Sequence, residues 1–142
     1  MLNVENIYKT FNAGTVNEKV ALRGLNLHLK PGDFVTVIGG NGAGKSTLLN
    51  SVAGVFSVDE GKITIDGVDV THLPEYKRAK YIGRVFQDPM MGTAATMQIE
   101  ENLALAMRRG KKRTLRSGIT KAEREKIADQ VLALTSELSM EI

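Results

Sequence analysis

The sequence predicts a single α/β domain, and three observations support this prediction. Short stretches rich in β-branched and aromatic residues occupy the first half of the chain, at 2–7, 20–29, 34–38 and 63–65. Helical periodicity dominates the second half, most clearly over 120–138. The stretch at 34–38 is followed by a glycine-rich turn and then by a helical pattern. This order is typical of a strand, a loop and a helix that form one unit.

The composition supports one globular domain and excludes several functional classes. The chain has 142 residues, 42% of them hydrophobic, a formal net charge of +3 and no cysteine. The lack of cysteine and the presence of only two histidines exclude a disulfide framework and a thiolate or histidine-rich metal site. No apolar run approaches the roughly 18 residues of a membrane span, and the start lacks the basic region of a signal peptide. We therefore expect a soluble chain in a reducing, cytoplasmic setting.

The strand pattern predicts two kinds of sheet. Alternating apolar residues at 2–7 and 20–29 indicate half-buried strands, and Asp66-Gly67 after 63–65 favours a tight hairpin turn, so these strands should be antiparallel neighbours. The stretch 34–38 is almost continuously β-branched or aromatic, which is typical of a strand buried on both faces of a parallel sheet. Residues 81–86 should form a second strand of that parallel core.

Four helices are predicted. They span 44–53, ending at Gly54, then 74–80, 99–108 and a final helix that begins after Thr120. Thr120 and Glu123 have the spacing of a capping box at the start of the last helix. The residues expected on its apolar side are Ile127, Val131, Leu134 and Leu138.

The segment between the strand at 34–38 and the helix at 44–53 matches G-x-x-x-x-G-K-[ST], the pattern of a loop that binds a polyphosphate. Glycine lets the backbone curl, so that the amides of residues 41 to 46 point into one concavity at the positive end of the helix. The alternative is a glycine-rich turn that matches by chance. The predicted contacts with ATP are Gly39, Asn41, Gly42, Ala43, Gly44, Lys45, Ser46 and Thr47.

Three side chains of this segment have predicted roles. The Lys45 ammonium should neutralise the β- and γ-phosphates, the Ser46 hydroxyl should bind Mg²⁺, and Thr47 should bond the α-phosphate. ATP and Mg²⁺ are therefore the expected ligands.

The order of segments resembles that of the ATP-binding subunits of ABC transporters over about residues 2 to 125. The matching segments are Val4–Phe11, Ala21–Leu27, Lys30–Phe34, the phosphate loop, Gly61–Gly67 and Val85–Asp88. The resemblance implies that Phe11 stacks on adenine. It also implies that Gln87 touches Mg²⁺ or the attacking water and communicates the nucleotide state to the membrane subunits. The alternatives are that Phe11 is a core aromatic residue and that Gln87 is a polar residue without function at a strand end.

We therefore predict a P-loop nucleotide hydrolase fold with an N-terminal antiparallel β subdomain, an incomplete parallel core sheet and a partial helical subdomain. The whole of 1–142 is interpreted as a partial ATP-binding domain, with a nucleotide-binding core at 1–97 and a partial helical region at 98–142.

The resemblance also implies partners. The segment 86–97 looks like that of a subgroup that serves bacterial importers of amino acids. The expected partners are transmembrane permease subunits, a second ATP-binding subunit and a separate substrate-binding protein, which would place the chain at the cytoplasmic face of the cell membrane. Met90, Met91 and Met97 are interpreted either as an adaptable contact surface for the permease or as core filling.

The chain lacks three later parts of the family pattern: a Leu-Ser-Gly-Gly-Gln-type signature, an apolar strand ending in Asp-Glu, and a histidine after Gln87. Because catalysis of phosphoryl transfer depends on positioning and charge stabilisation, we expect ATP binding without appreciable hydrolysis by the chain alone. The main hypothesis is the ATP-binding subunit of a transporter. The alternatives are a truncated, non-catalytic nucleotide-binding module and a small P-loop kinase.

A basic segment follows the third predicted helix. It comprises Arg108, Arg109, Lys111, Lys112, Arg113 and Arg116. The two interpretations are a solvated loop and a surface for anionic lipid headgroups. No aromatic residues alternate with the basic ones, so nucleic acid is not an expected partner.

Overall fold

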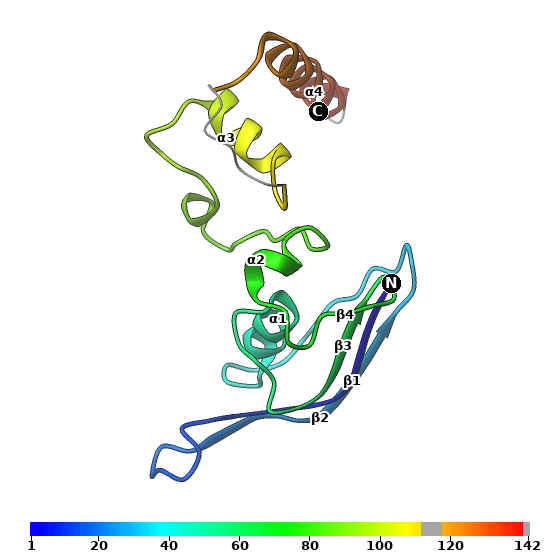
Figure 1. Ribbon diagram of the computed structural model, residues 1–142, viewed down its shortest axis with the longest axis vertical. Helices are drawn as coiled ribbons and strands as arrows, with labels where there is room; N and C mark the ends of the chain where they lie inside the picture. The colour runs from blue at the N-terminus through cyan, green and yellow to red at the C-terminus, as the bar shows by residue number, and fades with distance from the viewer. Residues whose placement is uncertain (112–117, 141–142) are drawn as a thin grey trace. The chain divides into compact units, whose positions relative to one another are not determined.

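The structure is a computed structural model that describes residues 1–111 and 118–140, the last three by their backbone alone. It divides into two compact units, Met1–Gly83 and Arg84–Ile142. The first unit contains a sheet with two helices, and the second is helical (Figure 1). Lys112, Arg113 and Arg116 of the basic segment and the side chain of Leu138 lie outside the described residues. The proposed division at residues 97 and 98 stays a prediction.

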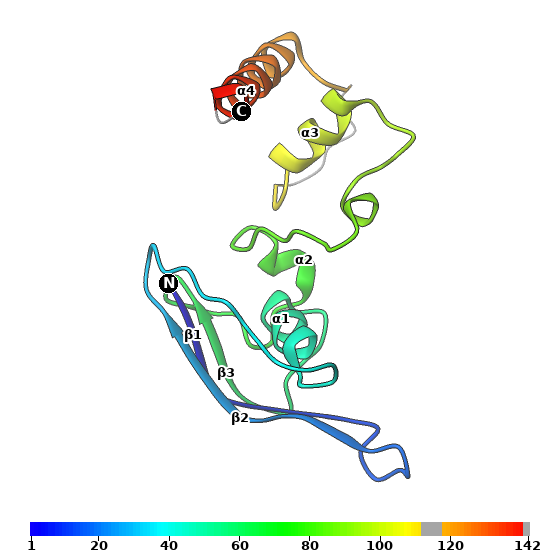
Figure 2. The same ribbon diagram turned by 180° about the vertical axis from the view of Figure 1, so that it is seen from behind.

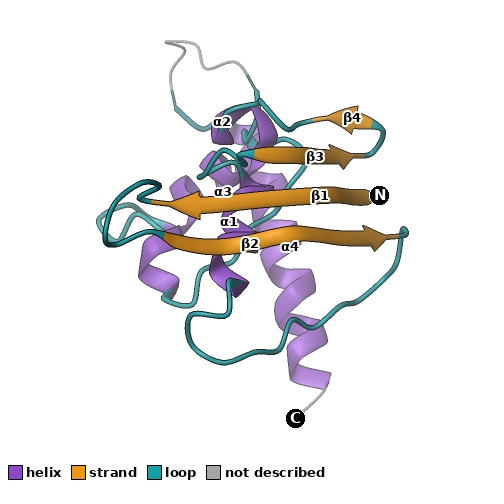
Figure 3. Cartoon of the chain, turned by 90° about the horizontal axis from the view of Figure 1, so that it is seen from below, coloured by secondary structure: helices purple, strands orange, loops and turns teal. Residues whose placement is uncertain are grey.

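The sheet of the first unit has four strands in the order β2-β1-β3-β4, and all of its neighbours are antiparallel (Figure 3). This arrangement confirms the antiparallel β subdomain. The first three strands are longer than the predicted 2–7, 20–29 and 63–65: the first ends later in the chain, and the second and third begin earlier. The strands are β1 (Leu2–Phe11), β2 (Lys19–Leu29), β3 (Glu60–Ile65) and β4 (Val68–Asp69).

The predicted tight turn between β3 and β4 is confirmed. Asp66 and Gly67 have φ values of 49° and 78°, and Ile65 pairs directly with Val68. Two positive φ angles in a row are the geometry of the two-residue hairpin turn whose twist matches that of the strands. The turn brings β4 back along β3 and leads into the loop before the second helix.

Helix α1 (Lys45–Ala53) packs on the sheet through Leu48 and covers one of its faces (Figures 1 and 2). Helix α2 (Glu75–Arg78) follows β4, with Pro74 at its N-cap. Burial of apolar surface between the sheet and α1 is the main force that holds the unit together. The buried core consists of Val4, Ile7, Leu22, Leu48, Ile63, Ile65 and Val70.

The two strands predicted for a parallel core are wrong for this structure. Residues 34–38 and 81–86 form no strand, and Phe34 and Ile38 are 94% and 90% exposed. A strand buried on both faces needs hydrogen-bonded neighbours and a layer on each face, and the described residues supply neither to these segments. The sequence of 34–38 gives it the propensity to form a strand, but a strand forms only where a neighbouring strand is available to pair with it.

The second unit contains a 3₁₀ turn and two helices: η1 (Pro89–Gly92), α3 (Ile99–Met107) and α4 (Lys121–Met140). Neither helix of this unit, nor any other in the described part of the chain, is long and apolar enough to cross a membrane. Ile127 is buried, as predicted. Val131 and Leu134 are exposed, so the apolar side predicted for the last helix is not covered along its length.

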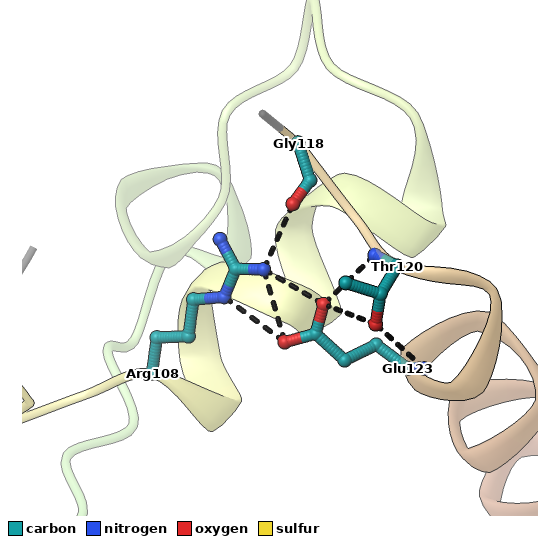
Figure 4. Close-up of polar contacts among 4 residues, drawn as sticks. All are labelled: Arg108, Gly118, Thr120 and Glu123. Carbon is teal, nitrogen blue, oxygen red and sulfur yellow. Dashed lines mark hydrogen bonds and ion pairs between the residues drawn. The ribbon is translucent and has the colours of Figure 1, made fainter. Parts of the chain in front are cut away.

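The start of α4 is tied to the end of α3 by an ion pair (Figure 4). Arg108 donates from Nη2 to both carboxylate oxygens of Glu123, at 2.9 and 2.8 Å, and also to the carbonyl of Gly118. Thr120 and Glu123 bond each other in the predicted capping box. The Arg108 guanidinium and then the Thr120 donors lower the pKa of Glu123 from its ordinary value of 4.5 to about 2.

The lowered pKa of Glu123 predicts a pH-dependent stability. Because the folded pKa lies below the unfolded one, the ionised carboxylate stabilises the fold above about pH 4.5, and this contribution is lost as the pH falls toward 2. Glu123→Gln should lower the thermal midpoint at pH 7, and the difference from the wild type should shrink between pH 5 and pH 2. Glu125→Gln, on an exposed side chain of the same helix, is the control. An equal effect of both variants at every pH would contradict this account.

Candidate functional site

The predicted phosphate loop is a curled turn between the end of segment 34–38 and the start of α1. The amide of Ala43 donates to the carbonyl of Gly40 at 3.2 Å, which closes one turn of the loop. Gly42 and Gly44 have φ values of 80° and 86°, a conformation that side chains with a Cβ rarely adopt. The backbone therefore curls at the motif's second glycine, Gly44, and at Gly42, which this sequence places at a variable position of the motif.

Gly44 is the position of this loop at which a Cβ would overlap another part of the backbone. A Cβ added there would lie 2.6 Å from the carbonyl oxygen of Ala21 in β2, closer than real Cβ contacts. The same Cβ would lie 3.4 Å from the side chain of Leu22, which belongs to the core. The second glycine of the motif thus lets the loop lie directly against the sheet. The contact positions the start of α1 relative to β2.

The loop leaves backbone amides available at the start of α1. Gly44 is the N-cap of the helix and provides no side-chain cap, and the first helical bond is donated by the amide of Leu48 to the carbonyl of Gly44 at 2.8 Å. The amides of Lys45, Ser46 and Thr47 therefore have no hydrogen-bond acceptor within the described part of the chain. Such donors, at the positive end of a helix dipole, bind anions.

The Lys45 side chain folds back over the loop. Its ammonium donates to the carbonyl of Gly39 and, at 2.8 Å, to the carbonyl of Gly40. An ammonium has three N–H donors, so one remains for a ligand after these two bonds. Gly39 lies close to both Lys45 and Ala43, since a Cβ on it would meet both of their side chains. The cation is thus held at the curled part of the loop.

A second cation, which sequence reasoning missed, lies at the phosphate loop. The Nζ of Lys19, the first residue of β2, lies 3.4 Å from the position of a Cβ on Gly42. Lys19 pairs across the strands with Phe11, the residue predicted to contact adenine. The structure therefore brings Phe11, Lys19 and the phosphate loop to the same end of the β1–β2 hairpin. The strand register was the only signal that could have revealed this.

Phe11 has aromatic and charged neighbours of its own. Its ring meets that of Phe56 edge to face, with centroids 5.2 Å apart, and the Lys9 ammonium lies 5.5 Å from its centroid. Asp59 holds this end of β1 by accepting from the amide of Thr10 at 2.6 Å and from Lys9 at 3.2 Å. The Thr10 bond, with a smaller contribution from Lys9, lowers the pKa of the Asp59 carboxyl. The role of Phe11 stays a prediction.

The remaining predicted site residue, Gln87, belongs to the second unit and is exposed. It precedes Asp88, whose carboxylate caps η1 by accepting from the amide of Met90 at 2.9 Å. The role of Gln87 stays a prediction. Met90 and Met91 are exposed, so neither fills the core of the unit.

Comparison with known proteins decides the family. The sequence model of the ABC transporter family matches residues 22–140 of this chain. The chain belongs to the ABC transporter family. A tyrosine transport ATP-binding protein of Clostridioides difficile is 42% identical to it over 111 residues, which are 78% of this chain and 44% of that protein. The methionine import ATP-binding protein MetN of Corynebacterium diphtheriae is 37% identical over 138 residues, which are 93% of this chain and 37% of that protein.

Solved structures of ABC cassettes share the fold. The dimeric cassette MJ0796 in a post-hydrolysis state with ADP and Pi matches with a TM-score of 0.72 and 29% identity, covering 96% of this chain and 57% of that one. A nucleotide-free ABC cassette matches with a TM-score of 0.63 and 33% identity, over 81% of this chain and 43% of that one. These similarities confirm the predicted P-loop fold class. The chain spans less than half the length of the two relatives named above.

The steric limit at Gly44 predicts a stability effect that is specific to this position. Gly44→Ala should lower the free energy of unfolding by about 1–3 kcal/mol, because the alanine would have a positive φ and its Cβ would overlap the Ala21 carbonyl. Gly40→Ala is the matched control in the same loop, since a Cβ there meets nothing within 4 Å, and should change stability by less than about 0.5 kcal/mol. Urea unfolding measures both, and equal losses would contradict the assignment.

Proposed function

We propose that this chain binds ATP with Mg²⁺ through the loop at residues 39–47, as the ATP-binding part of an ABC transporter. The observation that carries the proposal is the set of unpartnered amides at the start of α1, next to the Lys45 ammonium, in a turn that glycine alone can form. A triphosphate tail is a multivalent anion with many acceptor oxygens. Its chemistry therefore matches a concave set of N–H donors with an adjacent cation.

Different residues of the loop would bind different parts of Mg-ATP. The amides of residues 41–46, apart from that of Ala43, which donates to the Gly40 carbonyl, and the Lys45 ammonium would hold the β- and γ-phosphates, and Thr47 would bond the α-phosphate. The Ser46 side chain is exposed at the start of α1, where its hydroxyl is available to a metal ion. Mg²⁺ prefers oxygen ligands and is commonly held by phosphates with few protein groups, which fits a site with one hydroxyl. Gln87 would contact Mg²⁺ or the attacking water.

The neighbours of the loop support a base site beside the phosphate site. Phe11 pairs with Lys19 across the β1–β2 hairpin, and the Lys19 ammonium lies at Gly42 of the loop. An aromatic residue therefore lies at the same end of the hairpin as the phosphate loop. Stacking of adenine on Phe11 would add apolar contact to the electrostatic binding of the phosphates. The competing role of Phe11 as a packed aromatic residue is supported by its edge-to-face contact with Phe56.

In the proposed transporter the chain would act with other subunits. The chain would lie at the cytoplasmic face of the membrane, bound to transmembrane permease subunits. Closure of two ATP-binding subunits around ATP would change the conformation of the permease subunits. A separate substrate-binding protein would deliver the substrate to them. The relatives described above are a tyrosine transport protein and a methionine import protein, which supports amino-acid import. The exposed Met90 and Met91 would offer an adaptable contact surface to the permease.

A second candidate is a nucleotide-binding module without turnover of its own. Its support is that the chain carries the phosphate loop but spans only 44% and 37% of the length of the two relatives named above. Phosphate release by the chain in the presence of its membrane partners would support the transporter subunit. Nucleotide binding without release under the same conditions would support the module.

The proposal predicts that ATP affinity depends on Lys45. Lys45→Ala removes a charge-assisted bond to the phosphates and should raise the Kd for Mg-ATP at least about tenfold. Isothermal titration calorimetry measures the Kd, and the thermal midpoint of each variant shows whether the chain is still folded.

Lys30→Ala is the matched control, because it removes the same charge from an exposed side chain of the same unit. It should leave the Kd within about a factor of two. Equal Kd values for the wild type and Lys45→Ala would refute binding through this loop.

A further inference from the structure

Arg78, in α2, is a buried cation that the site described above does not use. It is 2% exposed, and its guanidinium donates four hydrogen bonds to backbone carbonyls. Nη1 donates to Ser51 and Val52 at 2.8 and 3.0 Å, Nη2 to Thr71 at 2.9 Å, and Nε to Leu73 at 2.7 Å. Two of these acceptors lie in the last turn of α1, so Arg78 caps the carbonyl end of that helix.

The carbonyl end of α1, in place of a carboxylate, stabilises the buried positive charge of Arg78. No carboxylate lies within ion-pair distance of Arg78 in the described part of the chain. Burial lowers the pKa of Arg78, and the nearby charge of Asp69 opposes that shift. The carbonyl end of a helix carries a partial negative charge, which favours a cation at this place. Arg78 and α1 are thus coupled electrostatically as well as by hydrogen bonds.

The chain is shaped to admit the guanidinium. Gly54, which ends α1, has a φ of 87°, and a Cβ on it would lie 2.8 Å from Nε of Arg78. The amide of Gly54 donates to Ser51 at 3.3 Å, so the same turn both ends the helix and leaves room for the side chain. The hydrogen bonds of Arg78 therefore join three parts of the first unit at the carbonyl end of α1: α1 itself, α2 and the segment between β4 and α2.

The other end of the same helix is the phosphate loop. Helix α1 has nine residues, a length of about 14 Å, so the loop amides and the Arg78 cap are the two ends of one short rigid element. Fixing the carbonyl end limits how far the helix can tilt or slide, and hence where its amide end lies. A cation at this end also raises the electrostatic potential along the helix.

We propose that Arg78 is a positioning residue for the phosphate loop, which aligns the amide end of α1 with the phosphates and adds positive potential there. This inference rests on the function proposed above. It assigns to Arg78 a role in ligand affinity that goes beyond a contribution to folding. The charge component acts on phosphates, so its effect grows with the number of phosphate charges on the ligand.

The test compares ATP and ADP affinities, each with Mg²⁺, in matched variants. Arg78→Met keeps much of the side-chain length and removes the charge and its donors, whereas Arg78→Lys keeps the charge. Arg78→Met should raise the Kd for ATP about threefold to tenfold at a temperature well below its thermal midpoint, and raise the Kd for ADP less. Arg78→Lys should recover at least half of the loss. Lys77→Met, the same change of charge at the neighbouring exposed position, should shift the Kd by less than about twofold.

The outcomes separate the two proposals. A lower thermal midpoint for Arg78→Met with unchanged ATP affinity would overturn the positioning role, and equal losses for ATP and ADP would overturn the added positive potential. Failure of the wild-type chain to bind ATP would instead refute the proposed function itself. If Arg78→Met does not fold, the wild type is used: slower exchange of the Arg78 Nε–H with solvent when Mg-ATP binds supports the coupling, and an unchanged rate overturns it.

Discussion

The first turn of any α-helix has amide groups that the helix cannot satisfy, and at the start of α1 they include those of Lys45, Ser46 and Thr47. They follow a turn in which Gly44 lies so close to the Ala21 carbonyl that no side chain fits. A capping Ser, Thr, Asp or Asn at the N-cap would accept one of these bonds, but glycine has no side-chain acceptor. The local sequence thus forgoes helix stability at this end and leaves donors that an anion can use.

The surrounding elements can be understood as supports for that turn. Strand β2 supplies the Ala21 carbonyl against which the loop lies, and the core beneath it contains Leu48 from α1. At the far end of the helix, Arg78 holds the carbonyls of Ser51 and Val52. A nine-residue helix is too short to be stable alone, so its position depends on these contacts. The function proposed for the loop therefore depends on tertiary packing at both ends of α1.

Local features of the sequence predicted the structure well, whereas features that depend on distant partners did not follow from it. The capping box at Thr120 and Glu123, the hairpin turn at Asp66 and Gly67 and the curled loop all form, because each is determined by a few adjacent residues. The segment 34–38 has the composition of a buried strand but finds no pairing neighbour among the described residues, so it lies exposed and outside the sheet. Strand propensity describes a surface that is already half buried.

The residues that sequence reasoning missed show the same limit. In the sequence, no spacing or motif distinguishes Lys19 and Arg78 from the other basic residues. Their roles arise from the register of β1 with β2 and from the packing of α2 on the end of α1. Arg108 is a contrasting case: it was grouped with a basic segment, yet its charge is paired with Glu123.

The claim that the loop amides bind phosphate is tested most directly by nuclear magnetic resonance. The isotope-labelled chain would be titrated with inorganic tripolyphosphate and Mg²⁺, which removes any contribution from the adenine base. The account predicts that the largest chemical-shift changes occur at the amides of residues 42–47, and that they saturate together. Unchanged amides in this loop, or changes centred on the basic residues 108–111, would contradict it.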